Sequence, residues 1–445
     1  MSLWFDVDDL IRYYCATTRP TGIQRLSFEM FQQLRLVGAA HGVRFCRRTA
    51  VPPYFRAIDF AAFEAKLTTL IETPTAASPA ARPRHTWLRT RAKALPPGLR
   101  RNLGRIARAG REILLASRDI LRPAKNATIT CDTAFDLAGP VVFEPGDWLV
   151  NLGSSWSAPY SPDCLAGLKA RKVRFAVLVY DLVPLLFPEW SAPITLQEFR
   201  NWVRETLPAA DMLLTISRNT AADIATHLGP NLPPVKILPL GSRPRAAGPV
   251  PAAQPFVLFV STIEVRKNHA LMFKIWQQLL AQYPQAMVPD LVFAGKRGWL
   301  TGDFLQQMEN ANWLEGKIRF IESPTDAELA KLYQQCLFTV YPSLYEGWGL
   351  PVTESLSFGK TVAASNRASI PEAGGEFCTY FDPDNLAEAT AVIAGLIMQP
   401  ERVAALEARI AAYFNPPSWQ DTAMSLLAAL VEGEVAAMRE FDAAA

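Results

Sequence analysis

Short runs of hydrophobic residues, rich in Val, Ile, Leu and Phe, recur along the chain, and the segments between them repeat their hydrophobic residues with a helical period. Runs of this length are typical of buried strands, and the helical segments are typical of crossover connections. We therefore predict an α/β protein with parallel sheets. The predicted strands span residues 3–6, 128–131, 147–151, 173–180, 211–216 and 235–238 in the first half, and 256–261, 290–295, 317–321, 337–341, 361–365 and 377–381 in the second half.

A segment rich in Pro, Gly and Ala, "GSRPRAAGPVPAAQP" at 241–255, separates the two sets of predicted strands. It lacks a hydrophobic period, which is typical of a linker between domains. A chain of 445 residues also exceeds the usual size of a single core. The pattern predicts two doubly wound, Rossmann-like domains, 1–248 and 249–414. The remaining residues, 415–445, are predicted to form a helix that crosses back onto the first domain.

A basic insertion is predicted at about 72–125 within the first domain. Residues 82–125 contain 13 Lys or Arg against only Glu112 and Asp119. Within the insertion, residues 98–122 have the pattern of an amphipathic helix with arginines on its polar face. Such a helix can bind an anionic membrane surface, where each cation contributes roughly 1 kcal/mol, or it can simply pack on the protein. Nucleic acid is not an expected partner, because no recognised binding module accompanies the charge.

Composition and termini narrow the class of protein further. The net charge is only +3, and the six cysteines form no pair or Cys/His cluster of the kind that binds zinc. We expect reduced thiols, no metal and no cofactor. The first residues, "MSLWFDVDDL", do not have the pattern of a signal peptide, and the most hydrophobic run is too short to span a bilayer. The expected location is cytoplasmic, with peripheral attachment to the inner face of the membrane through the basic helix.

The stretch "SLYEGWGLPVTES" at 343–355 carries the clearest chemical signal. It is predicted to be a loop that follows a strand and opens a helix near Leu350, and the N-terminus of a helix favours anions. Gly347 and Gly349 allow the backbone to approach a ligand closely. Glu346 and Glu354 flank this turn and are expected to accept hydrogen bonds from hydroxyl groups. A ligand that combines phosphate with hydroxyls is a nucleotide sugar.

These residues also carry a family resemblance. "YPSLYEGWGLPVTESLSFGKTVAASNRASIPEAGG" resembles the E-x7-E signature of glycosyltransferase family 4, whose members are retaining enzymes of the GT-B fold. "FVSTIEVRKNHALMFKIW", "TRPTGIQRLSFEMF" and "VLVYDLVPLLFPEW" are similar to the family's Arg-Lys segment, glycine loop and acceptor-side strand, and "LLTISRNTAADI", "LVFAGKRGW" and "FNPPSW" also fit in order. The resemblance covers nearly the whole chain except about 55–125. "YDLVPLLFPE" and "VSTIEVRKNH" look most like bacterial mannosyltransferases of O-antigen or exopolysaccharide biosynthesis.

The resemblance implies roles for the donor side of the site. Arg266 and Lys267 would bind the diphosphate and stabilise its negative charge as the sugar leaves. Glu346 would contact hydroxyls of the transferred sugar, and Glu354 would hold the nucleotide ribose. The implied donor is GDP-mannose, by similarity, and the implied acceptor is a lipid-linked or growing surface glycan.

Further roles follow from the other matched segments. Backbone amides at Gly349 and Leu350 would touch sugar or phosphate, and Gly22 would approach the diphosphate or acceptor from the other domain. Asp181 would face the acceptor. Many members of the family carry His before this Asp, but this chain has Tyr180, so a role for that His does not transfer.

Plainer interpretations of the same residues stay open. The two glutamates could be surface acids, Arg266 and Lys267 a solvated helix start, Gly22 a helix N-cap and Asp181 a buried cap. The acids of "DVDD" at 6–9 are expected to form a turn rather than a metal site, and His269 is expected to be structural. At the level of function, the alternatives are a nucleotide-sugar epimerase of the same fold and an inactive scaffold that binds nucleotide sugar.

Overall fold

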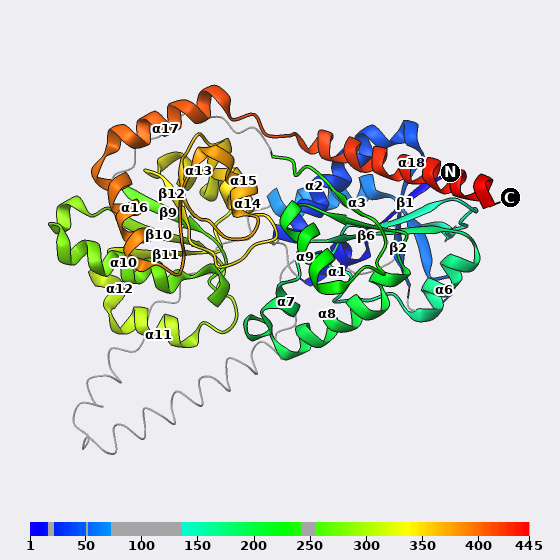
Figure 1. Cartoon of the computed structure of the whole chain (residues 1–445), viewed down its shortest axis with the longest axis horizontal. Coiled ribbons are helices and arrows are strands. Elements are labelled where there is room, and N and C mark those ends of the chain that lie inside the picture. The colour runs from blue at the N-terminus through cyan, green and yellow to red at the C-terminus, as the bar shows by residue number, and fades with distance from the viewer. Residues whose placement is uncertain (17–21, 50–51, 73–135, 243–253, 445) are drawn as a thin grey trace, which may run out of the picture.

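The computed structural model describes residues 1–16, 22–49, 52–72, 136–242 and 254–444, and these form two lobes that lie side by side (Figure 1). Each lobe is built around one sheet with helices on its faces. The predicted boundary between domains falls outside the described residues, as do the predicted strand 128–131 and the predicted basic helix 98–122.

The sheet of the N-terminal lobe has eight strands in the order β4-β3-β2-β1-β5-β6-β7-β8. Strand β3 pairs antiparallel with β2 and with β4, whereas the other neighbours are parallel. The strands are β1 (Leu3–Asp6), β2 (Val43–Arg48), β3 (Phe55–Ile58), β4 (Asp136–Pro140), β5 (Trp148–Asn151), β6 (Arg174–Val179), β7 (Met212–Thr215) and β8 (Val235–Ile237).

The sheet of the C-terminal lobe has six parallel strands in the order β11-β10-β9-β12-β13-β14. They are β9 (Phe256–Val260), β10 (Asp290–Gly295), β11 (Ile318–Glu322), β12 (Thr339–Tyr341), β13 (Val362–Ser365) and β14 (Cys378–Phe381). Strands such as β9 and β13 are almost completely buried, because helices cover both faces of the sheet.

Helices connect the strands and complete both lobes. Those of the N-terminal lobe are α1 (Asp8–Ala16), α2 (Gly22–Val37), α3 (Phe60–Glu72), α6 (Pro162–Ala170), α7 (Val183–Leu186), α8 (Pro193–Glu205) and α9 (Arg218–Leu228). Those that follow are α10 (His269–Gln282), α11 (Gly302–Asn310), α12 (Asn312–Glu315), α13 (Asp326–Gln335), α14 (Leu350–Ser357), α15 (Ile370–Gly374), α16 (Leu386–Met398), α17 (Pro400–Tyr413) and α18 (Trp419–Ala444).

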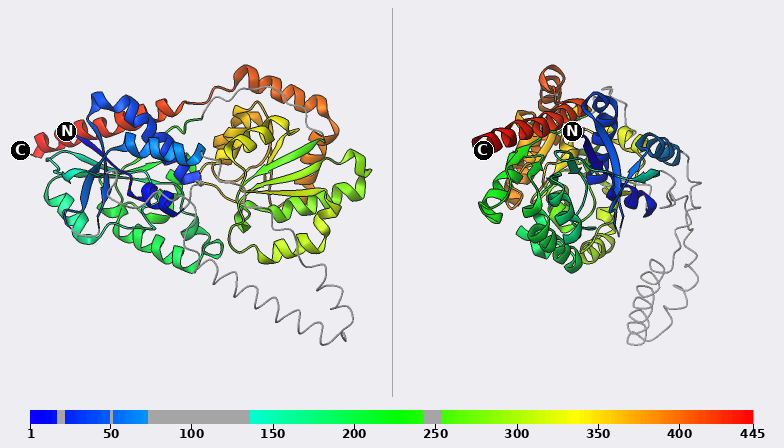
Figure 2. Two further views of the ribbon diagram at one scale, coloured as in Figure 1. Left: turned by 180° about the vertical axis from the view of Figure 1, so that it is seen from behind. Right: turned by 90° about the vertical axis from the view of Figure 1, so that its right-hand side faces the viewer.

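The last helix, α18, leaves the C-terminal lobe and lies along the N-terminal lobe, so both ends of the described chain are found on the same lobe (Figure 2). Helix α18 packs against α2. Its apolar side chains, Trp419, Leu426 and Leu430 among them, are part of the same buried cluster as Leu3 and Phe5 of β1. Burial of this apolar stripe is the force that holds the end of the chain on the first lobe.

The two-sheet α/β prediction is confirmed, and eleven of the twelve predicted strands have a counterpart in the structure. The prediction of purely parallel sheets is wrong at one edge, where β3 and β4 are antiparallel. Sequence reasoning missed β2, β3 and β4. Segments such as "VRFCRR" and "FRAI" carry arginines within short strands, and therefore lack the continuous hydrophobic run of a central strand.

Two further expectations, on the state of the cysteines and on membrane-spanning helices, can be compared with the described residues. Cys46, Cys164, Cys336 and Cys378 carry free thiols, whereas Cys15 is disulfide-bonded, so the expectation of six reduced cysteines is wrong at this residue. Wide spacing along the sequence does not fix the distance between cysteines in the fold. Within the described ranges no single helix is long and apolar enough to cross a membrane, although the pair α16 and α17, bent by 89°, passes by length and composition.

Candidate active site

The best-defined polar cluster lies at the carboxyl edge of the C-terminal sheet, at the place where the strand order reverses. Strand β9 has β10 on one side and β12 on the other, so the switch point of the sheet lies between β9 and β12. Ligands of open α/β sheets bind at this kind of switch point. The loop after β9 carries Arg266 and Lys267, and the loop after β12 carries Glu346 and Gly349. Topology therefore brings together residues that are 79–80 positions apart.

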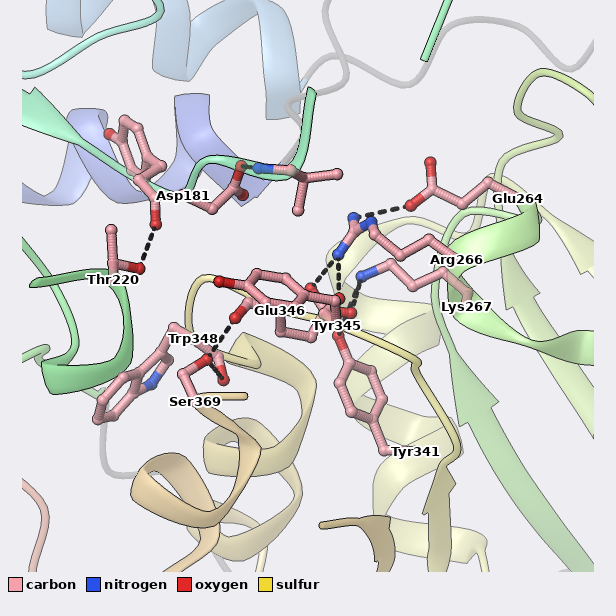
Figure 3. A network of polar contacts seen from close by, with 12 residues as sticks. Asp181, Thr220, Glu264, Arg266, Lys267, Tyr341, Tyr345, Glu346, Trp348 and Ser369 are labelled. Carbon is pink, nitrogen blue, oxygen red and sulfur yellow. Dashed lines mark hydrogen bonds and ion pairs between the residues drawn. The ribbon is translucent and has the colours of Figure 1, made fainter. Parts of the chain in front are cut away.

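Arg266 is the centre of this cluster (Figure 3). Its Nη1 donates to Glu346 Oε2 at 2.6 Å and to the carbonyl of Tyr345 at 2.7 Å, and its Nη2 donates to Glu264 Oε1 at 2.7 Å. Burial alone would lower the pKa of Arg266, but the carboxylates of Glu346 and Glu264 raise it, so the side chain stays charged. A guanidinium has five N–H donors, and these three bonds leave two for a ligand.

Lys267 and Glu346 form the second half of the cluster. Lys267 Nζ donates to Glu346 Oε1 at 2.5 Å and to the hydroxyl of Tyr341 at 3.1 Å, and that hydroxyl donates to Glu346 at 3.0 Å. Burial would raise the pKa of Glu346, yet Arg266 and Lys267 lower it to about 2. Burial and the charge of Arg266 both lower the pKa of Lys267. The result is a preorganised group in which two cations pair with the carboxylates of Glu346 and Glu264.

Asp181 approaches this cluster from the other lobe. It follows β6, and its Oδ1 accepts a hydrogen bond from Val183 N at 3.1 Å (Figure 3). Burial raises the pKa of Asp181, and the charge of Arg266 opposes that shift. The loop after β12 comes so close here that a Cβ on Gly347 would lie 2.3 Å from the carbonyl oxygen of Tyr180 and 3.1 Å from Asp181 Cβ. The two lobes are therefore in direct backbone contact at the cluster.

Glu354 lies one helical turn into α14 and is fixed by partners from both lobes. Its Oε1 accepts from Arg25 Nη1 of helix α2 at 2.9 Å, and its Oε2 accepts from the Tyr333 hydroxyl at 3.1 Å. Arg25 also forms an ion pair with Asp326. Arg25 lies in the segment that resembles the family's glycine loop, but the sequence alone indicates no role for it.

The three remaining predicted site residues meet at the start of α14. Gly349 is its N-cap residue, with φ at 118°, a conformation that disfavours any residue with a side chain. Leu350 is the first residue of the helix, and the first N–H groups of a helix have no partner within it. Gly22 begins α2 of the other lobe, and its α-carbon faces Leu350, because a Cβ there would lie 3.6 Å from Leu350 Cδ1.

Further contacts across the cleft involve residues that the sequence did not single out. Both carboxylate oxygens of Glu372 accept from backbone N–H groups of Arg218 and Asn219, at 2.8 Å each, and so cap helix α9 of the opposite lobe. The hydroxyl of Tyr345 donates to Asp223 and accepts from Asn219 Nδ2 at 2.9 Å. Side chains of both lobes thus join the two lobes beside the cluster.

The acids of "DVDD" take part in ion pairs of the N-terminal lobe. Arg48 Nε lies 2.8 Å from Asp6, and Arg12 Nε lies 2.7 Å from Asp8. Asp9 Oδ2 accepts from the backbone N–H of Ser154 at 2.9 Å. Within the part of the chain that the structure describes, no group of three or more His, Cys, Asp or Glu side chains is placed to hold a metal ion.

His269, at the start of α10, is buried behind Lys267. Its ring is 2% exposed, stacks on Phe259 with 4.3 Å between ring centroids, and places Nε2 3.2 Å from Ser261 Oγ. Burial, helped by the charge of Lys267, lowers the pKa of His269 from 6.5 to about 3. The position suits packing rather than contact with a ligand.

The depressed pKa predicts a pH dependence of stability. The unfolded chain takes up a proton on His269 below about pH 6.5, but the folded chain does not until about pH 3. The neutral His269 therefore has no effect on the free energy of unfolding above pH 6.5, and it lowers that free energy as the pH falls from 6.5 toward 3. At pH 5 the expected loss is about 2 kcal/mol, measured by urea unfolding at pH 7 and pH 5. His269→Asn should reduce this loss of unfolding free energy between pH 7 and pH 5. His227→Asn, at an exposed site on α9, should leave the loss unchanged. An equal loss in both variants would contradict the prediction.

Comparison with known proteins shows which family the segment carrying this cluster is similar to. Residues 243–415, which include Arg266, Lys267, Glu346 and Glu354, match the family model described as glycosyl transferases group 1. Over these residues the chain is similar to the group 1 glycosyl transferases. The matched segment contains both loops of the switch point, so the cluster lies within the part of the chain that is similar to this family.

Two similar proteins with curated names are mannosyltransferases. O-antigen chain mannosyltransferase B of Escherichia coli is 29% identical over 270 residues, which cover 58% of this chain and 65% of that protein. GDP-mannose:cellobiosyl-diphosphopolyprenol alpha-mannosyltransferase of Komagataeibacter xylinus is 31% identical over 159 residues, which cover 34% of this chain and 39% of that protein. The matches therefore span less than two thirds of the relatives' own length.

Solved structures extend the fold comparison to the whole chain. Sucrose-phosphate synthase of Thermosynechococcus elongatus superposes with a TM-score of 0.57 at 17% identity and covers 100% of both chains. HepE of Anabaena, solved with UDP and glucose, gives a TM-score of 0.58 at 13% identity and covers 97% of this chain and 99% of its own. At such low identity these likenesses establish the fold alone, and that fold is GT-B, as the sequence predicted.

Proposed function

We propose that the protein is a retaining glycosyltransferase of family 4 that transfers mannose from GDP-mannose to a lipid-linked or growing bacterial surface polysaccharide. The observation that carries this proposal is the cluster of Arg266, Lys267 and Glu346 at the switch point of the group 1 domain. The names of the similar mannosyltransferases support the choice of sugar, donor and glycan class.

The cluster matches the charge that develops during sugar transfer. As the bond between the anomeric carbon and the phosphate oxygen breaks, negative charge collects on the departing diphosphate. Arg266 retains two N–H donors and Lys267 retains one, after the bonds described above. The N-terminus of α14 adds a partial positive charge beside them. Because these groups are held in place before the reaction, they stabilise the leaving group without reorganising.

The remaining residues would position the two substrates. Glu346, ionised at neutral pH, would accept hydrogen bonds from hydroxyls of the transferred sugar. Glu354, oriented by Arg25 and Tyr333, would hold the ribose. Asp181 would face the acceptor hydroxyl. In the retaining reaction that hydroxyl oxygen attacks the anomeric carbon on the face the phosphate leaves, and its proton passes to the departing phosphate oxygen.

The proposed donor makes a prediction for ligand binding. A nucleotide sugar at 100 times its dissociation constant should add about 2.7 kcal/mol to the stability of the folded protein. Thermal unfolding in the presence of GDP-mannose, GDP, UDP-glucose and dTDP sugars should therefore give the largest increase in Tm with GDP-mannose. Stabilisation by UDP-glucose alone would contradict the choice of donor, and no stabilisation by any of them would contradict the donor site itself.

Arg25 provides a sharper test of the role of Glu354. Arg25→Ala removes one of the two donors that fix the Glu354 carboxylate, and a hydrogen bond between charged groups contributes about 1.5–3 kcal/mol. We expect the dissociation constant of GDP-mannose to rise by about tenfold, measured by calorimetry, because each 1.4 kcal/mol corresponds to a factor of ten.

Asp326→Asn serves as the matched control for Arg25. Asp326 is also a partner of Arg25, but its side chain is 71% exposed and does not contact Glu354. The dissociation constant of GDP-mannose for this variant should lie within about twofold of that for the unchanged protein, because exposed ion pairs contribute little. Equal effects of the two substitutions would show that Arg25 acts through general contact between lobes rather than through Glu354.

The expected cytoplasmic location, the peripheral membrane contact through residues 98–122 and the absence of a required metal or cofactor stay predictions. Each concerns a property outside the geometry of the cluster. Binding of the full chain to vesicles with and without anionic lipid tests the membrane contact.

A further inference from the structure

Tyr345 directly precedes Glu346, is only 8% exposed, and forms hydrogen bonds with both lobes. On the C-terminal side, its carbonyl accepts from Arg266 Nη1 at 2.7 Å, and the same nitrogen donates to Glu346 (Figure 3). On the N-terminal side, its hydroxyl donates to Asp223 and accepts from Asn219 Nδ2 at 2.9 Å. One residue therefore links the cation cluster to helix α9 of the other lobe.

The contact between Tyr345 and α9 consists of several bonds. Asn219 Nδ2 also donates to Asp223 Oδ2 at 2.9 Å, so the amide, the carboxylate and the phenol hydroxyl form a triangle of hydrogen bonds. Burial and the hydrogen bond to Asp223 raise the pKa of Tyr345, so its hydroxyl stays protonated and donates. The ring of Tyr345 also packs against Phe187, with 5.2 Å between ring centroids. These contacts hold the side chain of Tyr345 and, with it, the carbonyl that accepts from Arg266.

Helix α9 also holds the segment that carries Asp181. Thr220, whose position in the sequence lies between the two partners of Tyr345, is fully buried, and its hydroxyl donates to the carbonyl of Tyr180 at 3.2 Å. Asp181 is the next residue. From the C-terminal lobe, Glu372 accepts from two backbone N–H groups at the start of α9, at 2.8 Å each. The start of α9 therefore contacts the segment of Asp181 and the segment of the cation cluster at once.

The distance between Asp181 and Arg266 depends on how the lobes are joined, because each residue follows a strand of a different sheet. Sugar transfer needs its two substrates held in a fixed geometry, and a misplacement of about 1 Å can lower the rate by about 10²-fold. The backbone contact of Gly347 with Tyr180 limits how closely the two segments approach. The hydrogen bonds to α9 provide the opposite restraint, because they resist separation of the segments.

We propose that Tyr345 is a positioning residue, which ties the Arg266 cluster to helix α9 and so lets that helix align the donor side of the site with Asp181. The proposal rests on the function proposed above and adds to it the element that keeps the two sides of the site in register. Tyr345 acts through its carbonyl, which accepts from Arg266, and through the position of the neighbouring Glu346.

The kinetic test removes the bond between Tyr345 and α9 from each side. Tyr345→Phe deletes only the hydroxyl, and Asp223→Ala deletes its acceptor. In each variant kcat for mannose transfer should fall by about tenfold, the usual effect of losing one hydrogen bond to a charged group. The dissociation constant of GDP-mannose, measured by calorimetry, should stay within about twofold, because the cations keep their charge and partners. The double variant should transfer at about the rate of either single variant, because both changes break the same bond.

Two matched controls make the same chemical changes at exposed sites. Tyr413→Phe removes the hydroxyl of a tyrosine that is 72% exposed at the end of α17, and Asp303→Ala removes an exposed carboxylate of α11. Both should transfer mannose at the rate of the unchanged protein. A loss of donor affinity as large as the loss of kcat in Tyr345→Phe and Asp223→Ala, additive losses in the double variant, or normal transfer by both single variants would each overturn the proposal.

Hydrogen exchange tests the anchoring without any substrate. Peptides that contain residues 344–350 should exchange their amide hydrogens faster in Tyr345→Phe than in the unchanged protein, because this segment loses a contact that holds it, whereas Tyr413→Phe should show no change. Equal exchange in all three proteins would overturn the proposal. If the unchanged protein transferred no mannose, the proposed function would fail, but faster exchange in Tyr345→Phe would still support the anchoring by α9.

Discussion

Replacement of Arg266 by alanine is expected to lower the rate of sugar transfer by at least about 10²–10³-fold, the usual effect of removing one preorganised donor from a developing negative charge. Arg266 is also the partner that offsets the buried carboxylates of Glu264 and Glu346. Its loss should therefore destabilise the fold by about 3–5 kcal/mol. Initial rates with GDP-mannose and unfolding curves in urea measure the two effects separately.

Two further variants separate catalysis from folding. Arg266→Lys keeps the positive charge but loses the planar guanidinium with its several N–H donors. It should restore most of the stability, while the rate of sugar transfer stays well below that of the unchanged protein. Arg367→Ala removes a partly exposed arginine that pairs with Asp382 and Asp384. It should leave both the rate of sugar transfer and the free energy of unfolding nearly unchanged. If folded Arg266→Ala protein transferred sugar at the normal rate, the proposed role of the cation cluster would be refuted.

Addition of a single methyl group at Gly347 is expected to reduce transfer by about 10²-fold, because a displacement near 1 Å in a reacting site has effects of that size. A Cβ at this position would lie 2.3 Å from the carbonyl oxygen of Tyr180. That oxygen also accepts a hydrogen bond from Thr220 at 3.2 Å, so it cannot move away without losing a partner. The lobes must then separate, which small-angle X-ray scattering with bound GDP would detect as a larger radius of gyration.

Gly302→Ala is the control for this substitution. Gly302 begins α11 in the same lobe, and a Cβ there would meet no atom within 4 Å. Its transfer rate and radius of gyration should equal those of the unchanged protein. Normal transfer by Gly347→Ala would mean that the close contact of the lobes at Tyr180 is not needed for the reaction.

The sequence predicted much of the fold because most strands of both sheets are buried on both faces. A strand such as β9 must then be hydrophobic at nearly every position, and that pattern is visible without a structure. The antiparallel edge was not predictable in the same way. Strands β2 and β3 mix buried and less buried positions and carry arginines, so their hydrophobic signal is weak.

The candidate site was predictable where one loop carries several functional groups. The spacing of Glu346, Gly349 and Glu354 along a single loop and helix is local information, and the family pattern added Arg266 and Lys267. The structure joins Arg266 and Lys267 to Glu346, and it joins Glu354 to Arg25 and Tyr333 instead. The roles assigned to these residues stay predictions.

Contacts between lobes could not be predicted from the sequence. Arg25 and Glu354 are 329 positions apart, and Asn219 and Tyr345 are 126 apart. No local pattern indicates that such residues meet, because their distance depends on how two independently formed sheets are placed. The ion pair of Asp6 on β1 with Arg48 on β2 was missed for the same reason, whereas Asp8 and Arg12 form a local i,i+4 pair within α1.

The most direct test of the central claim is the product formed from GDP-mannose and a synthetic mannooligosaccharide with a lipid-like aglycone. Mass spectrometry should show an acceptor that has gained one hexose, with one GDP released for each product, and NMR should show the new linkage in the α configuration of the donor. Mannose converted to another sugar without acceptor, an inverted linkage, or a donor that binds and remains intact would contradict the account.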